Sequence, residues 1–97
     1  MKTTPLPNVT VKIADALRTR TLGASQVHTQ ACSVRQALNK LAESDPELAR
    51  RLFSSDGTLR RTVVVCVDGQ DIRLRQGLDT ALGDNAEVVL VAAISGG

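Results

Sequence analysis

The chain has 97 residues, a length that fits one domain with one modest hydrophobic core. Hydrophobic residues make up 42% and charged residues 23%, which is typical of a globular domain and excludes a disordered chain. The formal net charge of +2 is too balanced to indicate nucleic acid or anionic lipid as a partner. Phe53 is the only aromatic residue, so the core must be aliphatic and stacking platforms for bases are missing.

The basic residues fall in pairs along the chain, which is the one irregularity in the charge pattern. Solvated surface charge is the ordinary interpretation of such pairs. A docking surface for an acidic partner is the sharper alternative, and both remain open from the sequence. The pairs are Arg18/Arg20, Arg50/Arg51, Arg60/Arg61 and Arg73/Arg75.

Two strands with a polar turn between them are predicted at the beginning of the chain. Residues 8–15 alternate apolar with polar or small side chains, the pattern of a half-buried strand, after an extended lead-in over residues 1–7. Residues 18–24 indicate a polar turn and residues 25–30 a short second strand. We therefore expect an antiparallel hairpin.

A helix is predicted next. Ser33 and Gln36 have the spacing of a capping box, in which side chains satisfy backbone N–H groups at a helix start. Apolar residues then recur at helical spacing on one face: Val34, Ala37, Leu38 and Leu41. This main helix should run to residues 43–44. Pro46 interrupts it and, at a tolerated first-turn position, predicts a second short helix or turn over residues 46–53.

The second half of the chain contains the most apolar segments. Residues 62–67 predict a central strand, because they are apolar almost throughout. Asp68-Gly69 indicates a hairpin turn that leads to a short strand at residues 71–74. Residues 77–85 predict a single helical turn around two leucines, and residues 86–94 predict a last apolar strand.

This order of elements predicts an α+β roll, a mixed sheet of about five strands packed on one main helix. We expect a single domain over residues 1–97, with the extended lead-in at 1–7 and a flexible tail at 93–97. Residues 1–9 lack the apolar region of a signal peptide, and no stretch reaches the roughly 18 apolar residues of a membrane span. A cytoplasmic protein is expected, without membrane partners.

Nothing in the sequence indicates an active site of its own. Phosphate-loop and dinucleotide motifs are missing, as are Cys and His at metal-ligand spacing. His28 is the only histidine and is expected at the surface or a strand edge. Cys66 lies in an apolar run and is expected to be a small buried hydrophobe. Cys32 precedes a helix start, where a thiolate could be stabilised, but a reactive role is the less favoured interpretation.

The last residues, Ser95-Gly96-Gly97, are the exception. Glycine has no Cβ, so this stretch is as thin as a chain can be. The segment from Ala92 to Gly97, if extended, reaches about 20 Å at roughly 3.3 Å per residue. This length is enough to place the terminal carboxylate in a partner's buried site. A carboxylate must be activated before it reacts, and the chain has no nucleotide site. A frayed end without function is the alternative.

With this tail, the chain resembles the ubiquitin-like sulfur carriers of the MoaD/ThiS type, which share a β-grasp fold and end the last strand in Gly-Gly. The stretch VDGQDIRLRQGLDTALGDNAEVVLVAAISGG carries the resemblance, which is clear over residues 59–97 and weaker over 8–53. It looks closest to the branch that supplies sulfur for cysteine synthesis. Two departures stand out: Asp84-Asn85 replaces a common Gly-Asp, leaving Gly83 as the turn's glycine, and Ala92-Ala93 replaces a common proline pair.

The resemblance implies that Gly97 is adenylated by an E1-like enzyme, which uses ATP and Mg²⁺, and is then converted to a thiocarboxylate. Ile94, Ser95 and Gly96 would form the tail that enters the partner's site. The chain itself would bind no cofactor or metal and would be a carrier, not an enzyme. In the nearest branch the sulfur acceptor is an activated serine on a pyridoxal-phosphate-dependent cysteine synthase; other branches serve molybdopterin, thiamine or secondary metabolites.

Several alternatives stay open. Some family members carry residues after Gly-Gly that a metalloprotease removes, so this chain could be a native or a trimmed form. The second hypothesis is that the chain is a ubiquitin-like modifier, joined to lysines through Gly97. The third is that it is a plain interaction module. Partners should dock on the sheet face away from the helix, with Ile94 and Arg73 as candidate exposed residues near the tail. The faces of residues 63–67 cannot be assigned by periodicity.

Overall fold

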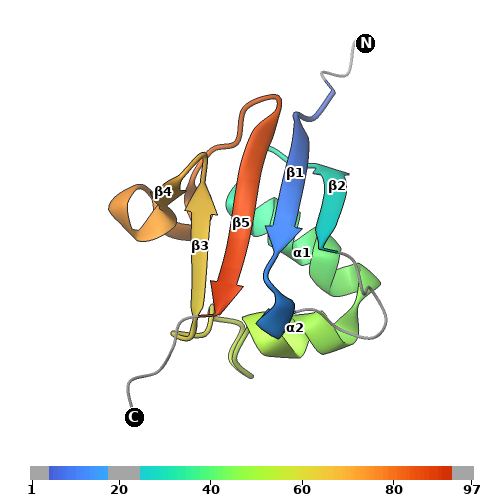
Figure 1. Cartoon of the computed structure of the whole chain (residues 1–97), viewed down its shortest axis with the longest axis vertical. Coiled ribbons are helices and arrows are strands. Elements are labelled where there is room, and N and C mark those ends of the chain that lie inside the picture. Colours follow the sequence, from blue (N-terminus) through green and yellow to red (C-terminus); the bar gives the residue numbers. More distant parts are fainter. Residues whose placement is uncertain (1–4, 18–24, 93–97) are drawn as a thin grey trace.

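The computed structural model describes residues 5–17 and 25–92 and contains a five-stranded mixed sheet with two α-helices on one face (Figure 1). The strand order is β2-β1-β5-β3-β4, with β1 and β5 parallel and the other neighbours antiparallel. This is the β-grasp roll that the sequence predicts. The elements are β1 (Asn8–Ile13), η1 (Asp15–Leu17), β2 (Gln26–Gln30), α1 (Val34–Ser44), α2 (Pro46–Leu52), β3 (Val63–Val67), β4 (Gln70–Asp71), η2 (Ile72–Leu74), η3 (Gly77–Asp79) and β5 (Ala86–Ala92).

The last strand, β5, is the centre of the sheet. It pairs with β1 on one side and with β3 on the other, and its Val88 and Leu90 are fully buried. The prediction of a central strand at residues 62–67 is wrong, because β3 lies one position further out and its other neighbour, β4, has two residues. Only one face of β3 enters the core. The hairpin of β1 and β2 is confirmed as an antiparallel pair, while its predicted turn at 18–24 lies outside the described residues.

The main helix, α1, begins at the predicted capping box. The Ser33 hydroxyl oxygen accepts a hydrogen bond from the Gln36 N–H at 3.2 Å. In return, the Gln36 side-chain oxygen accepts one from the Cys32 N–H at 2.8 Å, one residue before the cap. The first bond satisfies an N–H group that the first helical turn leaves without an intrahelical partner, and the second ties the residue before the cap to the helix. The helix then ends at Ser44, within the predicted range.

Asp45 forms the junction between the two helices. It is fully buried, and its Oδ1 accepts hydrogen bonds from the N–H groups of Glu47 and Leu48 at 3.1 and 3.2 Å. Its own N–H donates to Leu41 O at the end of α1. Pro46 occupies the first turn of α2, where its missing N–H costs nothing. The second short helix is therefore real.

The strand predicted at residues 71–74 is mostly wrong. Only Asp71 belongs to β4, and the next three residues form the 3₁₀ turn η2. The Asp71 carboxylate accepts a hydrogen bond from the Arg73 N–H at 2.8 Å, which caps this turn. Ile72 is 3% exposed and packs in the core, so the chain leaves the sheet edge in order to bury it.

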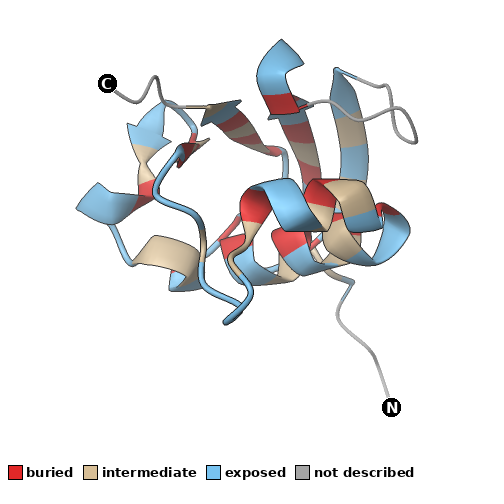
Figure 2. Ribbon diagram, turned by 90° about the horizontal axis from the view of Figure 1, so that it is seen from below, coloured by how far each residue is buried: buried red, intermediate tan, exposed pale blue. Residues whose placement is uncertain are grey.

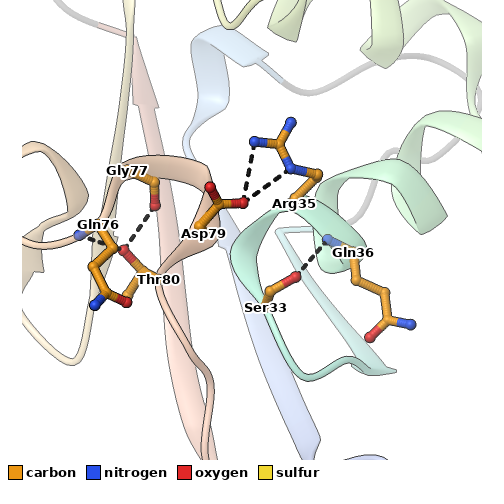
Figure 3. Close-up of polar contacts among 7 residues, drawn as sticks. All are labelled: Ser33, Arg35, Gln36, Gln76, Gly77, Asp79 and Thr80. Atoms are coloured by element: carbon orange, nitrogen blue, oxygen red, sulfur yellow. Dashed lines mark hydrogen bonds and ion pairs between the residues drawn. The ribbon is translucent and has the colours of Figure 1, made fainter.

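The segment after η2 closes the roll against α1 (Figure 3). Thr80 is buried; its hydroxyl donates to Gly77 O at 2.7 Å and accepts from the Gln76 N–H at 3.2 Å, which holds η3. The Arg35 guanidinium of α1 contacts the Asp79 carboxylate at 3.2 Å. The predicted helical turn is confirmed at Gly77–Asp79 but does not continue through the second leucine.

The turn before β5 has its left-handed residue at Asn85, with φ 66°. Asparagine tolerates this conformation better than most residues. The Asp84 side chain accepts a hydrogen bond from the Asn8 N–H at 2.9 Å, and the Asn85 N–H donates to Asn8 O at 2.8 Å. Gly83, the glycine that the sequence leaves in this turn, is not left-handed, so Asn85 and not the glycine adopts the special conformation.

The core lies between the sheet and the helices and is aliphatic, as predicted (Figure 2). Alternate residues of β1, β3 and β5 point into it, and α1 and α2 cover them. Phe53, the single aromatic residue, is half-buried and packs against the edge of this core. The largest fully buried apolar side chains are Leu38, Leu48, Leu52, Leu90, Val9, Val11, Val34, Val65, Val67 and Val88.

Candidate functional site

The predicted site residues Ile94, Ser95, Gly96 and Gly97 lie outside the described residues, and the structure shows how the strand before them is held. Ala92 is the last residue of β5 and pairs with Val63, the first residue of β3. Parallel pairing with β1 extends to Leu90, whose carbonyl also accepts a hydrogen bond from the Ala14 N–H at 3.0 Å. The tail therefore begins directly at the end of the central strand, which is paired on both sides up to Leu90.

The sheet face away from the helices carries an apolar patch beside this strand end. In β3 and β5, inward residues alternate with partly exposed ones, which assigns the faces that periodicity left open. Val64 pairs with Val91, and Cys66 pairs with Val89. These four residues form what we call the outer-face patch, and Val91 is 39% exposed. Because residues 63–67 are all apolar, only the pairing register of β3 with β5 reveals this patch.

The other half of the same face is polar. Lys12 of β1 forms an ion pair with Glu87 of β5, with Nζ and the carboxylate oxygen 3.2 Å apart. His28 of β2 is exposed, as expected; its Nδ1 lies 3.1 Å from the Thr10 hydroxyl and its Nε2 lies 3.3 Å from the Gln26 amide nitrogen. The outer face thus divides into a polar part on β2, β1 and Glu87 at the beginning of β5, and an apolar part on β3 and the rest of β5.

Arg73 borders the outer-face patch at its far end. Its guanidinium lies 2.6 Å from the Asp71 carboxylate, and Asp71 pairs with Cys66. Hydrogen bonds from the Arg73 side chain and N–H lower the pKa of Asp71, and the same side-chain bond raises the pKa of Arg73. Arg73 is exposed, as predicted, but it lies beyond the turn at the opposite end of β3 from Ala92. Arg73 therefore belongs to the η2 turn beside the sheet edge and is not a neighbour of the tail.

Neither cysteine forms a disulfide. Cys66 is half-buried in the outer-face patch, so the expectation of a buried core residue is wrong; its alternate position on β3 points it away from the helices. Cys32 is exposed and precedes α1. Within residues 5–17 and 25–92, no cluster of His, Cys, Asp or Glu could hold a metal ion.

The geometry therefore offers a firmly held strand end beside an apolar surface, which suits a protein that presents its tail to another protein. A family model matches residues 11–97, a range that includes both terminal glycines.

The chain belongs to the ThiS family.

Individual relatives agree. The sulfur carrier protein CysO of Mycobacterium tuberculosis is 34% identical over 92 residues, which is 93% of this chain and 99% of CysO. The crystal structure of the BexX/CysO complex of Amycolatopsis orientalis contains a chain that is 28% identical, with a TM-score of 0.80, covering 92% of this chain and 99% of that one. The resemblance to sulfur carriers of the MoaD/ThiS type is thus confirmed, and this ThiS-family chain is a carrier protein, not an enzyme.

A third relative is described as a modifier. The solution structure of small archaeal modifier protein 1 from Methanosarcina acetivorans is 26% identical, with a TM-score of 0.82, and covers 95% of this chain and 98% of that one. The β-grasp fold is therefore shared with both named classes. Among the described residues, no helix is long and apolar enough to cross a membrane.

Proposed function

We propose that this ThiS-family chain carries sulfur as a thiocarboxylate on Gly97. An E1-like enzyme would adenylate the Gly97 carboxylate with ATP and Mg²⁺ and release pyrophosphate. Sulfide would then attack the acyl carbon, form the C–S bond and expel AMP, which leaves the thiocarboxylate. The observation that carries this proposal is the family match, which continues through residue 97.

The structure supports the proposal through the placement of β5. Five residues follow Ala92, and extended they span about 17 Å at roughly 3.3 Å each. A partner that holds Gly97 must therefore also lie close to the end of the sheet. The outer-face patch lies beside that end, and Val64 and Val91 form its nearest pair. We propose this patch as the surface on which the activating enzyme docks.

The chemistry explains why a separate carrier is useful. A thiocarboxylate sulfur is a softer and better nucleophile than a carboxylate oxygen, and the tail can deliver it into an enclosed site. No residue of this chain needs to act as acid, base or nucleophile. By its similarity to CysO, we propose a pyridoxal-phosphate-dependent cysteine synthase as the acceptor, with activated serine as the substrate that receives sulfur. A metalloprotease would then free the product from Gly97.

The experiment is intact-mass spectrometry after incubation with the E1-like enzyme of the same organism, ATP, Mg²⁺ and inorganic sulfide. The mass should rise by the difference between one sulfur and one oxygen, and only when ATP is present. A chain that lacks Gly97 is the control and should not change. The proposal would be overturned if the mass of the full chain stayed unchanged while the same enzyme preparation formed a thiocarboxylate on another carrier protein.

The second candidate is a protein modifier, which the similarity to small archaeal modifier protein 1 favours. A lysine amine would attack the same adenylate and form an isopeptide bond. Covalent ladders that resist reducing agents and require Gly97 would support this candidate. A thiocarboxylate without such ladders would favour the carrier.

A further inference from the structure

A groove lies at the end of the molecule from which the tail departs. It has a volume of about 370 Å³ and lies where α2 passes into the loop before β3. Figure 1 shows α2, this loop and the end of β5 at the same end of the sheet. Ala49 and Phe53 form the apolar wall of the groove, and two arginines and two serines form its rim. The lining residues are Ala49, Arg50, Phe53, Ser54, Ser55 and Arg60.

Hydrogen bonds fix the shape of this groove. Phe53 ends α2, donates its N–H to Ala49 O at 2.9 Å, and pairs with Leu59 in an isolated bridge. The Ser54 N–H donates to Thr58 O at 2.7 Å across the loop, which turns at Gly57 with φ 86°. The loop is thus a small closed structure and not a loose connection, and the groove beside it is formed in advance.

Arg60 is held in place by the end of α2. Its N–H donates to Leu52 O and its Nε donates to Arg50 O, both at 2.8 Å. A guanidinium carries four further N–H donors, which can bind a carboxylate with two parallel hydrogen bonds. Because Arg60 already binds carbonyl groups at the helix end, it offsets the partial negative charge there.

The charges around the groove favour an anionic occupant. Arg50 and Arg60 line it, and Arg61 follows as an exposed neighbour. Arg51 is engaged elsewhere, since its guanidinium contacts the Glu47 carboxylate at 2.9 Å and Ala16 O at 3.2 Å. The nearby acidic group is Asp56, which does not line the groove and whose carboxylate accepts hydrogen bonds from the Thr58 hydroxyl and N–H.

The position of the groove identifies the kind of partner. The Val63 N–H donates to Arg60 O at 3.1 Å, and Val63 pairs with Ala92. Arg60 is therefore within roughly 15 Å of the tail's starting point, three residues and one strand spacing away. An enzyme that encloses Gly97 can stand no more than about 17 Å beyond Ala92, so a groove within roughly 15 Å of Ala92 lies within reach of the rim of its entrance.

We infer that the groove of Arg50, Phe53 and Arg60 docks an acidic segment of the activating enzyme, in which a carboxylate lies beside an apolar side chain. The carboxylate binds the guanidinium groups, and the apolar side chain packs on Phe53. This inference rests on the proposed function only in so far as a partner activates the tail. Activation precedes both sulfur transfer and conjugation, so the groove serves either outcome.

The test measures binding of the E1-like enzyme of the same organism by calorimetry at two salt concentrations, and the steady-state KM for the carrier. Arg50→Glu and Arg60→Gln are compared with Arg75→Glu and Arg75→Gln, matched changes at an exposed arginine beyond the other end of β3. Melting curves confirm that the variants fold, and Arg50→Glu spares the hydrogen bond that Arg60 makes. We expect a loss of affinity of about tenfold or more for the groove variants, with kcat within about twofold and a weaker salt dependence.

The outcomes separate the two proposals. Equal affinities of Arg50→Glu and Arg75→Glu would overturn the groove inference while leaving sulfur transfer intact. If Arg50→Glu weakens binding but the wild-type chain forms no thiocarboxylate, the groove inference would be supported and the proposed function would be overturned. A wild-type chain that does not bind the enzyme at all would overturn both.

Discussion

Val64 and Val91 lie opposite each other across the antiparallel β3–β5 pair, on the sheet face that the helices leave uncovered. Val91 is one residue from the end of β5, so this apolar pair is the part of the outer face closest to the tail. The proposed docking surface therefore lies beside the strand end from which the proposed sulfur-carrying tail continues.

The first prediction concerns this pair. Val91→Asp places a charge in the outer-face patch and should raise the KM of the activating enzyme for the carrier about tenfold, because a buried apolar contact at the interface is lost. Gln26→Asp, which adds the same charge on the polar half of the face, should leave KM within about twofold. Steady-state kinetics with melting curves for both variants make the comparison. Equal KM values would show that the patch is not the docking surface.

The second prediction concerns the junction of the helices. Asp45→Ala removes the acceptor for the Glu47 and Leu48 N–H groups and should lower the free energy of unfolding by about 1–3 kcal/mol. Asp45→Asn keeps an oxygen in that position and should lose less. Urea denaturation measures both. An Asp45→Ala variant as stable as the wild type would contradict the role of this buried cap.

The third prediction uses the left-handed residue before β5. Asn85→Val should lower the free energy of unfolding by about 1–2 kcal/mol, because a β-branched residue is strained at φ 66°. Asn85→Gly should be close to neutral. Gly83→Ala is the matched control and should be tolerated, since an added Cβ meets nothing within 4 Å and the backbone is not left-handed. If Gly83→Ala were the more damaging change, the assignment of the turn would be wrong.

The fourth prediction is a pH dependence. Arg73 lowers the pKa of Asp71, so the pair stabilises the native state above the ordinary carboxyl pKa of about 3.9, and this contribution is lost as the pH falls through the lowered value. Arg73→Gln should therefore lower the melting temperature slightly near neutral pH, and the difference should vanish in strong acid. The effect is small because both groups are exposed to solvent screening. Arg75→Gln should show no such trend, and a pH-independent difference for Arg73→Gln would contradict the pair's contribution.

Local signals in the sequence predicted local structure well. The capping box at Ser33 and Gln36 set the beginning of α1, and Pro46 set the break before α2, because both act through backbone groups within one turn. The aliphatic core followed from a composition with one aromatic residue. The predicted strand at 71–74 failed because burial of Ile72, a tertiary contact, outweighs the local preference for extended chain.

The surface features could not be predicted from the sequence, because they depend on how the strands pair in the sheet. In residues 63–67 every side chain is apolar, so only pairing with β5 distinguishes the buried Val63, Val65 and Val67 from the patch residues Val64 and Cys66. The groove at Arg50 and Arg60 likewise joins residues that are ten positions apart and that the loop before β3 brings together. The paired arginines were the sequence signal for it. The roles of the tail residues rest on the resemblance to the family; the family match confirms that resemblance, and the roles stay a proposal.

The most direct test of the account is to locate the sulfur. After incubation with the activating enzyme, ATP, Mg²⁺ and inorganic sulfide, tandem mass spectrometry of the C-terminal peptide should place one oxygen-to-sulfur exchange on the carboxyl group of Gly97. The Gly97 deletion and a reaction without ATP should give no such peptide. Sulfur found instead on Cys32 or Cys66, or a C-terminal peptide that stays unchanged while ATP is consumed, would contradict the claim that Gly97 is the sulfur-carrying residue.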